Sequence, residues 1–184
     1  ALANCPVETA SRCADPLCGT QLQFLTLQAD ALRQRVEAGR VIEGHGDLRA
    51  EHIYLAEAPV VIDCIEFNQE LRQIDIADEL GFLEVECDYL AATGVGAEIA
   101  RQCLHALDDD PPNALRAFYK CYRACVRAKV AALRSEANGA HAADERELQR
   151  YLQLASSYAR SFHTPLLIVV RGLMGCGKST LAEA

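Results

Sequence analysis

The chain has 184 residues, a net charge of −8 and a hydrophobic fraction of 51%. With a mean hydropathy near zero, it resembles an ordinary globular protein that can bury one core, or one domain and part of another. The acidic balance disfavours nucleic acid as a partner, because binding to a phosphate backbone needs a basic face. No apolar run approaches the ~20 residues that cross a membrane, so no membrane span is expected.

The nine cysteines form no C-x-x-C pair. An odd number without such a pair argues against a disulfide framework and against a zinc site. We expect most of them to be small buried side chains in a protein of the reducing cytoplasm. A metal role for Cys5, Cys13 and Cys18 is the alternative.

The first half of the chain predicts one helix and one hairpin. Residues 1–20 contain scattered prolines and a glycine and are expected to be irregular. Apolar residues recur at helical spacing over residues 21–38. The short runs "HIYL" and "PVVIDC" are rich in branched and aromatic residues, with "AEAP" between them, which predicts a small β-hairpin.

The second half is predicted to be helical. We expect helices over about 75–91, with a possible break near Gly81, and over "AEIARQCLHAL", 114–135 and 144–162. "TGVG" and "DDDPPN" are expected to be loops. The apolar run "LLIVV" then predicts a buried strand that opens a second unit near residue 164.

The C-terminal stretch "GLMGCGKS" fits the phosphate-binding pattern G-x-x-x-x-G-K-[ST] of a P-loop, or Walker A motif. Glycines let backbone N–H groups cradle phosphate oxygens at the start of a helix. Lys178 would reach the β- and γ-phosphates of ATP, and the hydroxyl of Ser179 would bind Mg²⁺. The predicted nucleotide-binding residues are Gly172, Gly175, Cys176, Gly177, Lys178, Ser179 and Thr180.

The stretch "VIEGHGDLRAEHIYL" places an aspartate, Asp47, in a turn before the predicted hairpin. Phosphoryl transfer to a hydroxyl needs a carboxylate that accepts the hydroxyl's proton and further groups that hold Mg²⁺ against the phosphates. Because the hairpin folds the chain back, Asp63 at the end of its second strand can lie beside the Asp47 loop. Taken alone, an aspartate after glycine is usually a turn former.

These residues carry a family resemblance. "HGDLRAEHI" resembles the catalytic loop His-Gly-Asp-x-x-x-x-Asn of the aminoglycoside phosphotransferases, and "VVIDCIEF" resembles their metal-binding strand. The chain is similar to a cytosolic group in which such a kinase-like domain precedes a P-loop domain of gluconate kinase or AAA type. The resemblance implies that Asp47 is the catalytic base, Asp63 a magnesium ligand and His45 part of the loop framework. It also implies that Asp75 or Asp78 anchors the loop.

The resemblance implies a fold class as well. Residues 1–163 would be the mainly α-helical C-terminal lobe of a protein-kinase-like fold, with a small β-hairpin. Residues 164–184 would be the first strand and P-loop of an α/β domain. Too few residues precede the loop for an N-terminal lobe, so the chain is expected to be a fragment with little activity of its own.

One position departs from the family pattern, since His52 stands where the family has asparagine. Imidazole is an uncommon magnesium ligand. His52 could therefore bind metal less well, recruit a different ion, or only hydrogen-bond to Asp47. Arg123, Arg127 and Lys129 are expected to form a solvated helix face, with substrate binding as the alternative.

The leading hypothesis is an ATP- and Mg²⁺-dependent phosphotransferase acting on a small-molecule hydroxyl, such as a sugar or an aminoglycoside. The alternatives are a non-catalytic kinase-like module that serves a P-loop domain, and an ATPase switch. The sequence predicts neither the acceptor nor the oligomeric state.

Overall fold

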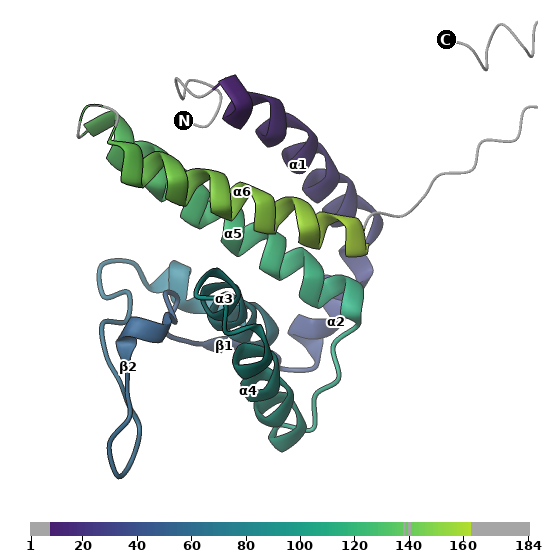
Figure 1. Cartoon of the computed structure of the whole chain (residues 1–184). Coiled ribbons are helices and arrows are strands. Elements are labelled where there is room, and N and C mark those ends of the chain that lie inside the picture. Colours follow the sequence, from purple (N-terminus) through teal and green to yellow (C-terminus); the bar gives the residue numbers. More distant parts are fainter. Residues whose placement is uncertain (1–7, 138, 140, 163–184) are drawn as a thin grey trace, which may run out of the picture.

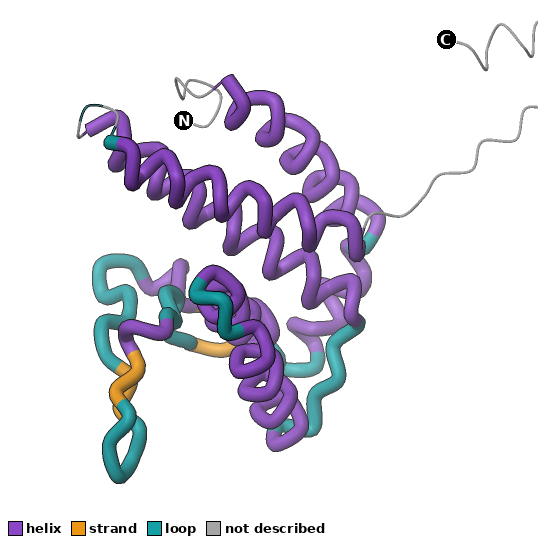
Figure 2. The backbone as a smooth tube through the Cα atoms, viewed as in Figure 1, coloured by secondary structure: helices purple, strands orange, loops and turns teal. Residues whose placement is uncertain are grey.

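The structure is a computed structural model that describes residues 8–137, 139 and 141–162. Helices dominate it, and the strands are short (Figures 1 and 2), which confirms the predicted mainly α-helical class with a small hairpin. The helices are α1 (Glu8–Leu27), α2 (Ala29–Glu37), α3 (Ile76–Tyr89), α4 (Thr93–Ala106), α5 (Asn113–Ala137) and α6 (Ala142–Phe162). The strands are β1 (Val41–Glu43), β2 (Ile53–Tyr54), β3 (Val60–Val61) and β4 (Gln73–Asp75).

The core lies between α5 and α6, which run side by side in opposite directions (Figure 1). Both were expected from their helical apolar period. The two helices can approach closely because the buried face of α5 carries small side chains. These are Ala124, Ala128, Ala131 and Ala132. Larger side chains of α6, among them Leu148 and Tyr151, are buried against this row.

Three aromatic rings join α1 to this helix pair. Phe24 stacks on Phe118 with ring centroids 4.5 Å apart, and Phe162 meets both rings edge-on. Offset stacked and edge-on arrangements suit the charge distribution of aromatic rings. Because Phe118 is buried, we expect its truncation to alanine to cost roughly 3–5 kcal/mol.

Two small antiparallel sheets position the segment between α2 and α3. In the predicted hairpin, β2 pairs with β3, with Ile53 opposite Val61. The other sheet was not predicted: β1 pairs with β4, with Val41 opposite Asp75. This second sheet brings the start of β1 next to the start of α3, although more than thirty residues separate them in sequence.

Two predictions of secondary structure were wrong. The first helix begins at Glu8 rather than near residue 21 and continues through Pro16, because burial of Leu17 and Phe24 outweighs local propensity. "TGVG" is not a loop but the first turn of α4. A Cβ on Gly96 would lie 2.7 Å from Cβ of Cys87, so this glycine permits close packing of α4 on α3.

The predicted break at "DDDPPN" is confirmed, since α5 begins at Asn113. Helix α3 continues without a break through Gly81. Among the described residues, no helix is both long and apolar enough to cross a membrane. The predicted strand "LLIVV", the domain boundary near residue 164 and the whole P-loop lie outside the described residues.

Candidate active site

The predicted catalytic loop follows β1 and is held by a buried carboxylate of α3. Oε2 of Glu79 accepts hydrogen bonds from the backbone N–H groups of His45, at 2.7 Å, and Gly46, at 3.0 Å. A Cβ on Gly44 would lie 2.3 Å from the same oxygen, so only glycine lets the chain approach this closely. The other oxygen, Oε1, is buried without a hydrogen-bond partner among the described residues.

A buried ion pair holds the loop from a second direction. Arg123 of α5 binds Asp78 of α3 through two hydrogen bonds of 2.7 and 2.8 Å, and it also donates to the carbonyl of Gly46 at 3.2 Å. Burial raises the pKa of Asp78, and the hydrogen bonds from Arg123 oppose that rise. The prediction that Arg123 lies on a solvated face was therefore wrong, because it is buried.

The two acidic residues expected to anchor the loop have other direct partners. Asp75 caps the first turn of α3 by accepting from the N–H of Ala77, and it binds Arg35 at 2.6 and 2.8 Å. Asp78 acts on the loop only through Arg123. The direct anchor is Glu79, which sequence reasoning missed. Its signal was a third acidic side chain on the helical face that carries Asp75 and Asp78, four residues after Asp75.

Asp47 lies between the two histidines. Its N–H donates to Nδ1 of His45 at 3.3 Å, while Nε2 of His45 lies 2.7 Å from the carbonyl of Ile62. These contacts fit the tautomer with the proton on Nε2. The framework role predicted for His45 agrees with this bridge from the loop to the hairpin. The half-buried carboxylate of Asp47 itself makes no hydrogen bond or ion pair within the described part of the chain.

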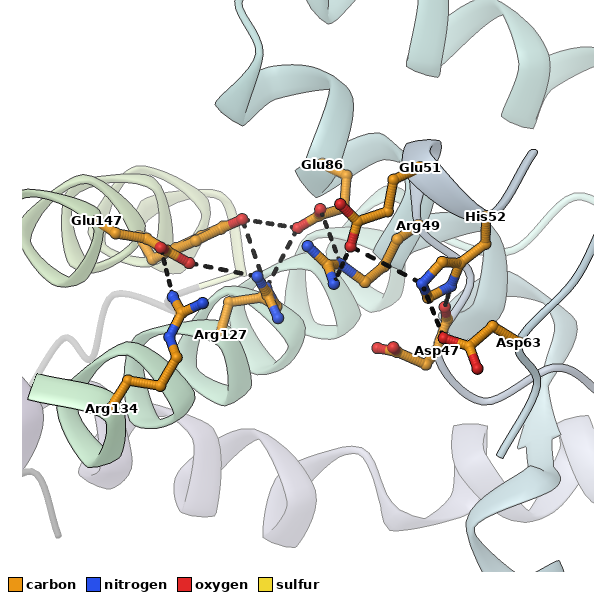
Figure 3. Close-up of polar contacts among 10 residues, drawn as sticks. Asp47, Arg49, Glu51, His52, Asp63, Glu86, Arg127, Arg134 and Glu147 are labelled. Atoms are coloured by element: carbon orange, nitrogen blue, oxygen red, sulfur yellow. Dashed lines mark hydrogen bonds and ion pairs between the residues drawn. The ribbon is translucent and has the colours of Figure 1, made fainter. Parts of the chain in front are cut away.

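His52 faces Asp63 from the other side of the loop (Figure 3). Its Nδ1 lies 2.9 Å from the carbonyl oxygen of Asp47, so this nitrogen carries the proton that the carbonyl accepts. In a neutral ring, Nε2 then presents a lone pair 3.5 Å from Oδ2 of Asp63. A lone pair opposite a carboxylate suits a shared cation, either a proton on the imidazole or a metal ion.

Asp63 reaches this position through an unusual backbone conformation. Its φ of 64° lies in the left-handed region, which aspartate tolerates better than most side chains. Its side chain is 77% exposed. The sequence therefore brings Asp47, His52 and Asp63 to one place, as predicted.

The residues fit a magnesium ion in part. No group of three or more histidine, cysteine or acidic side chains, among the residues that the structure describes, is arranged to hold a metal. Magnesium in phosphotransferases is commonly bound through only one or two carboxylates together with substrate phosphates and water. Asp63 supplies one such carboxylate and His52 a less usual nitrogen.

A pocket of about 470 Å³ borders the loop on the side of Arg49. A chain of alternating charges lines it and runs from the loop to α6 (Figure 3). The charged lining residues are Arg49, Glu51, Glu86, Arg127, Arg134 and Glu147. Within this chain, Glu86 accepts from Arg49 at 3.2 Å and from Tyr151 at 2.7 Å.

Arg127 completes the chain. It lies 3.5 Å from Glu86 and 3.3 Å from Glu147, which in turn binds Arg134. Arg127 was predicted on a solvated face and is instead buried. The lining offers positively charged hydrogen-bond donors and negatively charged acceptors, which suits a polar ligand with several hydroxyl or charged groups.

Comparison with known proteins gives relatives whose descriptions state no function. The chain is 37% identical over 151 residues to proteins of Mycobacterium tuberculosis and Mycobacterium bovis that are described as uncharacterized. The alignment covers 81% of this chain, which spans 30% of the length of those relatives. No family model matches the chain, and no solved structure matches it significantly.

Proposed function

We propose that this chain carries the catalytic loop of an ATP-dependent phosphotransferase that acts on a hydroxyl group of a small molecule. The observation that carries the proposal is the carboxylate of Asp47, which has no hydrogen-bond or ion-pair partner among the residues that the structure describes. It lies beside the His52–Asp63 pair, on a loop that Glu79 and Arg123 hold by hydrogen bonds. The resemblance of "HGDLRAEHI" and "VVIDCIEF" to the aminoglycoside phosphotransferases supports it.

In this proposal Asp47 orients the acceptor hydroxyl and takes its proton as the oxygen attacks the γ-phosphorus of ATP. The bond from the γ-phosphorus to the bridging oxygen breaks, and ADP leaves. Asp63 and His52 would hold Mg²⁺, which neutralises phosphate charge when it is bound. The pocket beside Arg49 is the proposed place of the acceptor, because it opens next to the loop and offers polar groups of both signs.

We further propose that the stretch from Gly172 to Thr180 belongs to a second nucleotide-binding domain. Its support is the sequence motif alone, with Lys178 for the phosphates and Ser179 for Mg²⁺. A cytoplasmic location is part of the proposal, since the cysteines that the structure describes are free thiols, as is usual in a reducing compartment.

A second candidate is a non-catalytic kinase-like module that serves the P-loop domain. The observation that favours it is the histidine at position 52, since imidazole is an uncommon magnesium ligand and the resembling family has asparagine there. In that case the loop has no catalytic role, and all ATP turnover depends on Lys178.

The two candidates are distinguished by ATP turnover of the complete gene product over a panel of sugars, sugar acids and aminoglycosides. Three variants are compared with the wild type: Asp47→Ala, Lys178→Ala and, as a control, Asp30→Ala, which removes an exposed carboxylate of α2. The phosphotransferase proposal requires acceptor-dependent turnover that Asp47→Ala lowers by at least about 10²-fold. Turnover that only Lys178→Ala abolishes would establish the second candidate.

A further inference from the structure

The charges that line the pocket beside Arg49 balance one another. Three arginines and three glutamates form its charged lining, and each arginine contacts at least one glutamate. The pairs are Arg49 with Glu51 and Glu86, Arg127 with Glu86 and Glu147, and Arg134 with Glu147. The lining residues therefore present no excess of either charge to a ligand.

Part of this lining is withdrawn from water. Glu86 and Arg127 are buried, and Glu147 is half-buried. Screening is weak at such positions, so a charge that a ligand brings in must be matched by an opposite charge. A ligand with several charges of one sign would have to break existing ion pairs and leave their members unpaired. The pocket therefore selects against strongly charged ligands of either sign.

Arg127 keeps hydrogen-bonding capacity for a ligand. Its Nε lies 3.5 Å from both Glu86 and the hydroxyl of Tyr151, and its Nη2 lies 3.3 Å from Glu147. Its Nη1 makes no hydrogen bond to any residue that the structure describes. Because Nη1 of a guanidinium carries N–H donors, this buried side chain of the pocket wall can donate to an oxygen of a ligand.

A hydroxyl group fits both halves of the Arg127–Glu147 pair. It can accept from the guanidinium and donate to the carboxylate, and it adds no charge. A carboxylate offers about four acceptor sites. Within the described part of the chain, that of Glu147 accepts only from Arg127 and Arg134. Neighbouring hydroxyls of a sugar can thus bind to Arg127 and Glu147 without breaking their ion pair.

Tyrosine rings complete the wall of the pocket. Half-buried Tyr89 stacks on buried Tyr151 with ring centroids 4.4 Å apart, and both line the pocket. An aromatic surface suits the C–H face of a sugar ring, while the hydroxyls at the rim of the sugar reach charged groups. The pocket volume of about 470 Å³ falls in the range of roughly 300–1,000 Å³ that is common for sites of small molecules.

We infer that the acceptor of this site is an uncharged polyol of about monosaccharide size, and that Arg127 and Glu147 bind its hydroxyls. The inference rests on the phosphotransferase proposed above. In Figure 3 the carboxylate of Asp47 points away from Asp63, towards the side of Arg49. One hydroxyl of the polyol loses its proton to Asp47 and gains the γ-phosphoryl group, and ADP leaves. Aminoglycosides, which carry several ammonium groups, and sugar acids are then poor acceptors.

The test uses the complete gene product and measures binding before turnover. Saturation-transfer NMR, with a non-hydrolysable ATP analogue present, detects the binding of small probes. The uncharged probes are D-glucose, D-fructose, D-ribose and D-mannitol, the anionic probe is D-gluconate, and the cationic probe is kanamycin. We expect at least one uncharged probe to bind more tightly than both charged probes.

Two charge variants make the test specific to the pocket. Glu147→Gln leaves an excess of positive charge, so it should weaken binding of the uncharged probe by about ten-fold and strengthen binding of gluconate. Arg134→Gln leaves the opposite excess and should strengthen binding of kanamycin. Glu136→Gln, at an exposed position of α5 outside the pocket, is the matched control and should change none of these affinities. An equal loss for all probes in Glu147→Gln would reveal a structural role and overturn the inference.

Turnover separates this inference from the phosphotransferase proposal. Phosphorylation of kanamycin or gluconate that Asp47→Ala abolishes would keep the phosphotransferase and overturn the uncharged acceptor. Failure of every uncharged probe to bind would also overturn it. An uncharged probe that binds in a Glu147-dependent way without being phosphorylated would support the assigned ligand class and refute the phosphotransferase.

Discussion

Nε2 of His52 lies 3.5 Å from Oδ2 of Asp63, across the hairpin that β2 and β3 form. The opposite ring nitrogen of His52 contacts the carbonyl of Asp47 at 2.9 Å. One imidazole therefore ties the proposed base to the proposed metal ligand. The asparagine of the resembling family would present a neutral oxygen at this position, whereas histidine presents a nitrogen that prefers softer divalent ions than Mg²⁺.

This difference predicts a metal preference. His52→Asn should weaken the binding of Co²⁺ to the chain by about ten-fold, because imidazole binds first-row transition metals better than an amide oxygen does. Paramagnetic broadening of the amide signals near residues 52 and 63 measures the binding locally, without interference from the cysteines. His105→Asn, which changes an exposed histidine of α4, is the matched control. Equal broadening in the wild type and His52→Asn would argue against a cation between these side chains.

Glu79 should determine how rigid the loop is. Glu79→Gln keeps the acceptor but removes the charge from two hydrogen bonds, so we expect a loss of about 1 kcal/mol of unfolding free energy. Glu79→Ala leaves both N–H groups without a partner and should cost about 3 kcal/mol. Hydrogen exchange at His45 and Gly46 should speed up in the same order. Glu98→Gln, at an exposed site on α4, should leave the exchange at His45 and Gly46 unchanged. Faster exchange of these two amides in Glu98→Gln would point to a general loss of stability instead.

Local patterns were enough to predict the parts of the site that lie close in sequence. The turn before Asp47, the hairpin and the approach of Asp63 follow from glycine, branched residues and a short connection. The long helices followed from their period, as for α5 and α6. These features depend on neighbours a few residues apart, which a sequence displays directly.

The supporting contacts could not be predicted because they join distant segments. Arg123 lies 77 residues from its partner Gly46, and a charged residue on a helix is usually solvated. Its burial depends on Asp78 on another helix, and no local pattern encodes that pairing. The "TGVG" segment was predicted to be a loop for the same reason. Its Gly96 lies in a helix and makes room for Cys87 of the neighbouring helix α3.

The close approach at Gly44 predicts a severe effect of a small change. Gly44→Ala would bring a methyl group to 2.3 Å from Oε2 of Glu79. Either the carboxylate must leave the two N–H groups that it holds or the loop must shift, at a cost of roughly 1–3 kcal/mol. Gly94→Ala is the matched control, because its Cβ would meet nothing within 4 Å. Alanine favours the helix, so this control should gain up to about 1 kcal/mol. Urea unfolding measures both, and a neutral Gly44→Ala would refute the steric argument.

The Arg123–Asp78 pair should show strong coupling. Arg123→Ala leaves a buried carboxylate alone and should cost about 3–5 kcal/mol, and Asp78→Ala should cost a similar amount. The double variant removes both charges and should be less destabilised than the sum of the single variants by at least about 2 kcal/mol. Additive losses would mean that the two side chains act independently.

The buried contact between Asp109 and Arg35 predicts that the free energy of unfolding depends on pH. Hydrogen bonds from Arg35 lower the pKa of Asp109 below its ordinary value of 3.8, although burial opposes them. The folded state therefore binds this proton less readily than the unfolded state. The ionised carboxylate stabilises the fold fully above the ordinary pKa, and this contribution is lost as the pH falls through the lowered pKa.

Asp109→Asn should consequently cost most at neutral pH, about 1–3 kcal/mol, because it removes the charge that Arg35 and Arg40 contact. The gap in unfolding free energy between wild type and variant should narrow steadily as the pH falls from about 5 towards 2. Asp110→Asn, at the exposed neighbouring position, should shift stability by less than about 0.5 kcal/mol throughout. Denaturant titrations at several pH values measure the gap. A gap that stays constant, or widens in acid, would show that Arg35 does not hold Asp109 in its charged form.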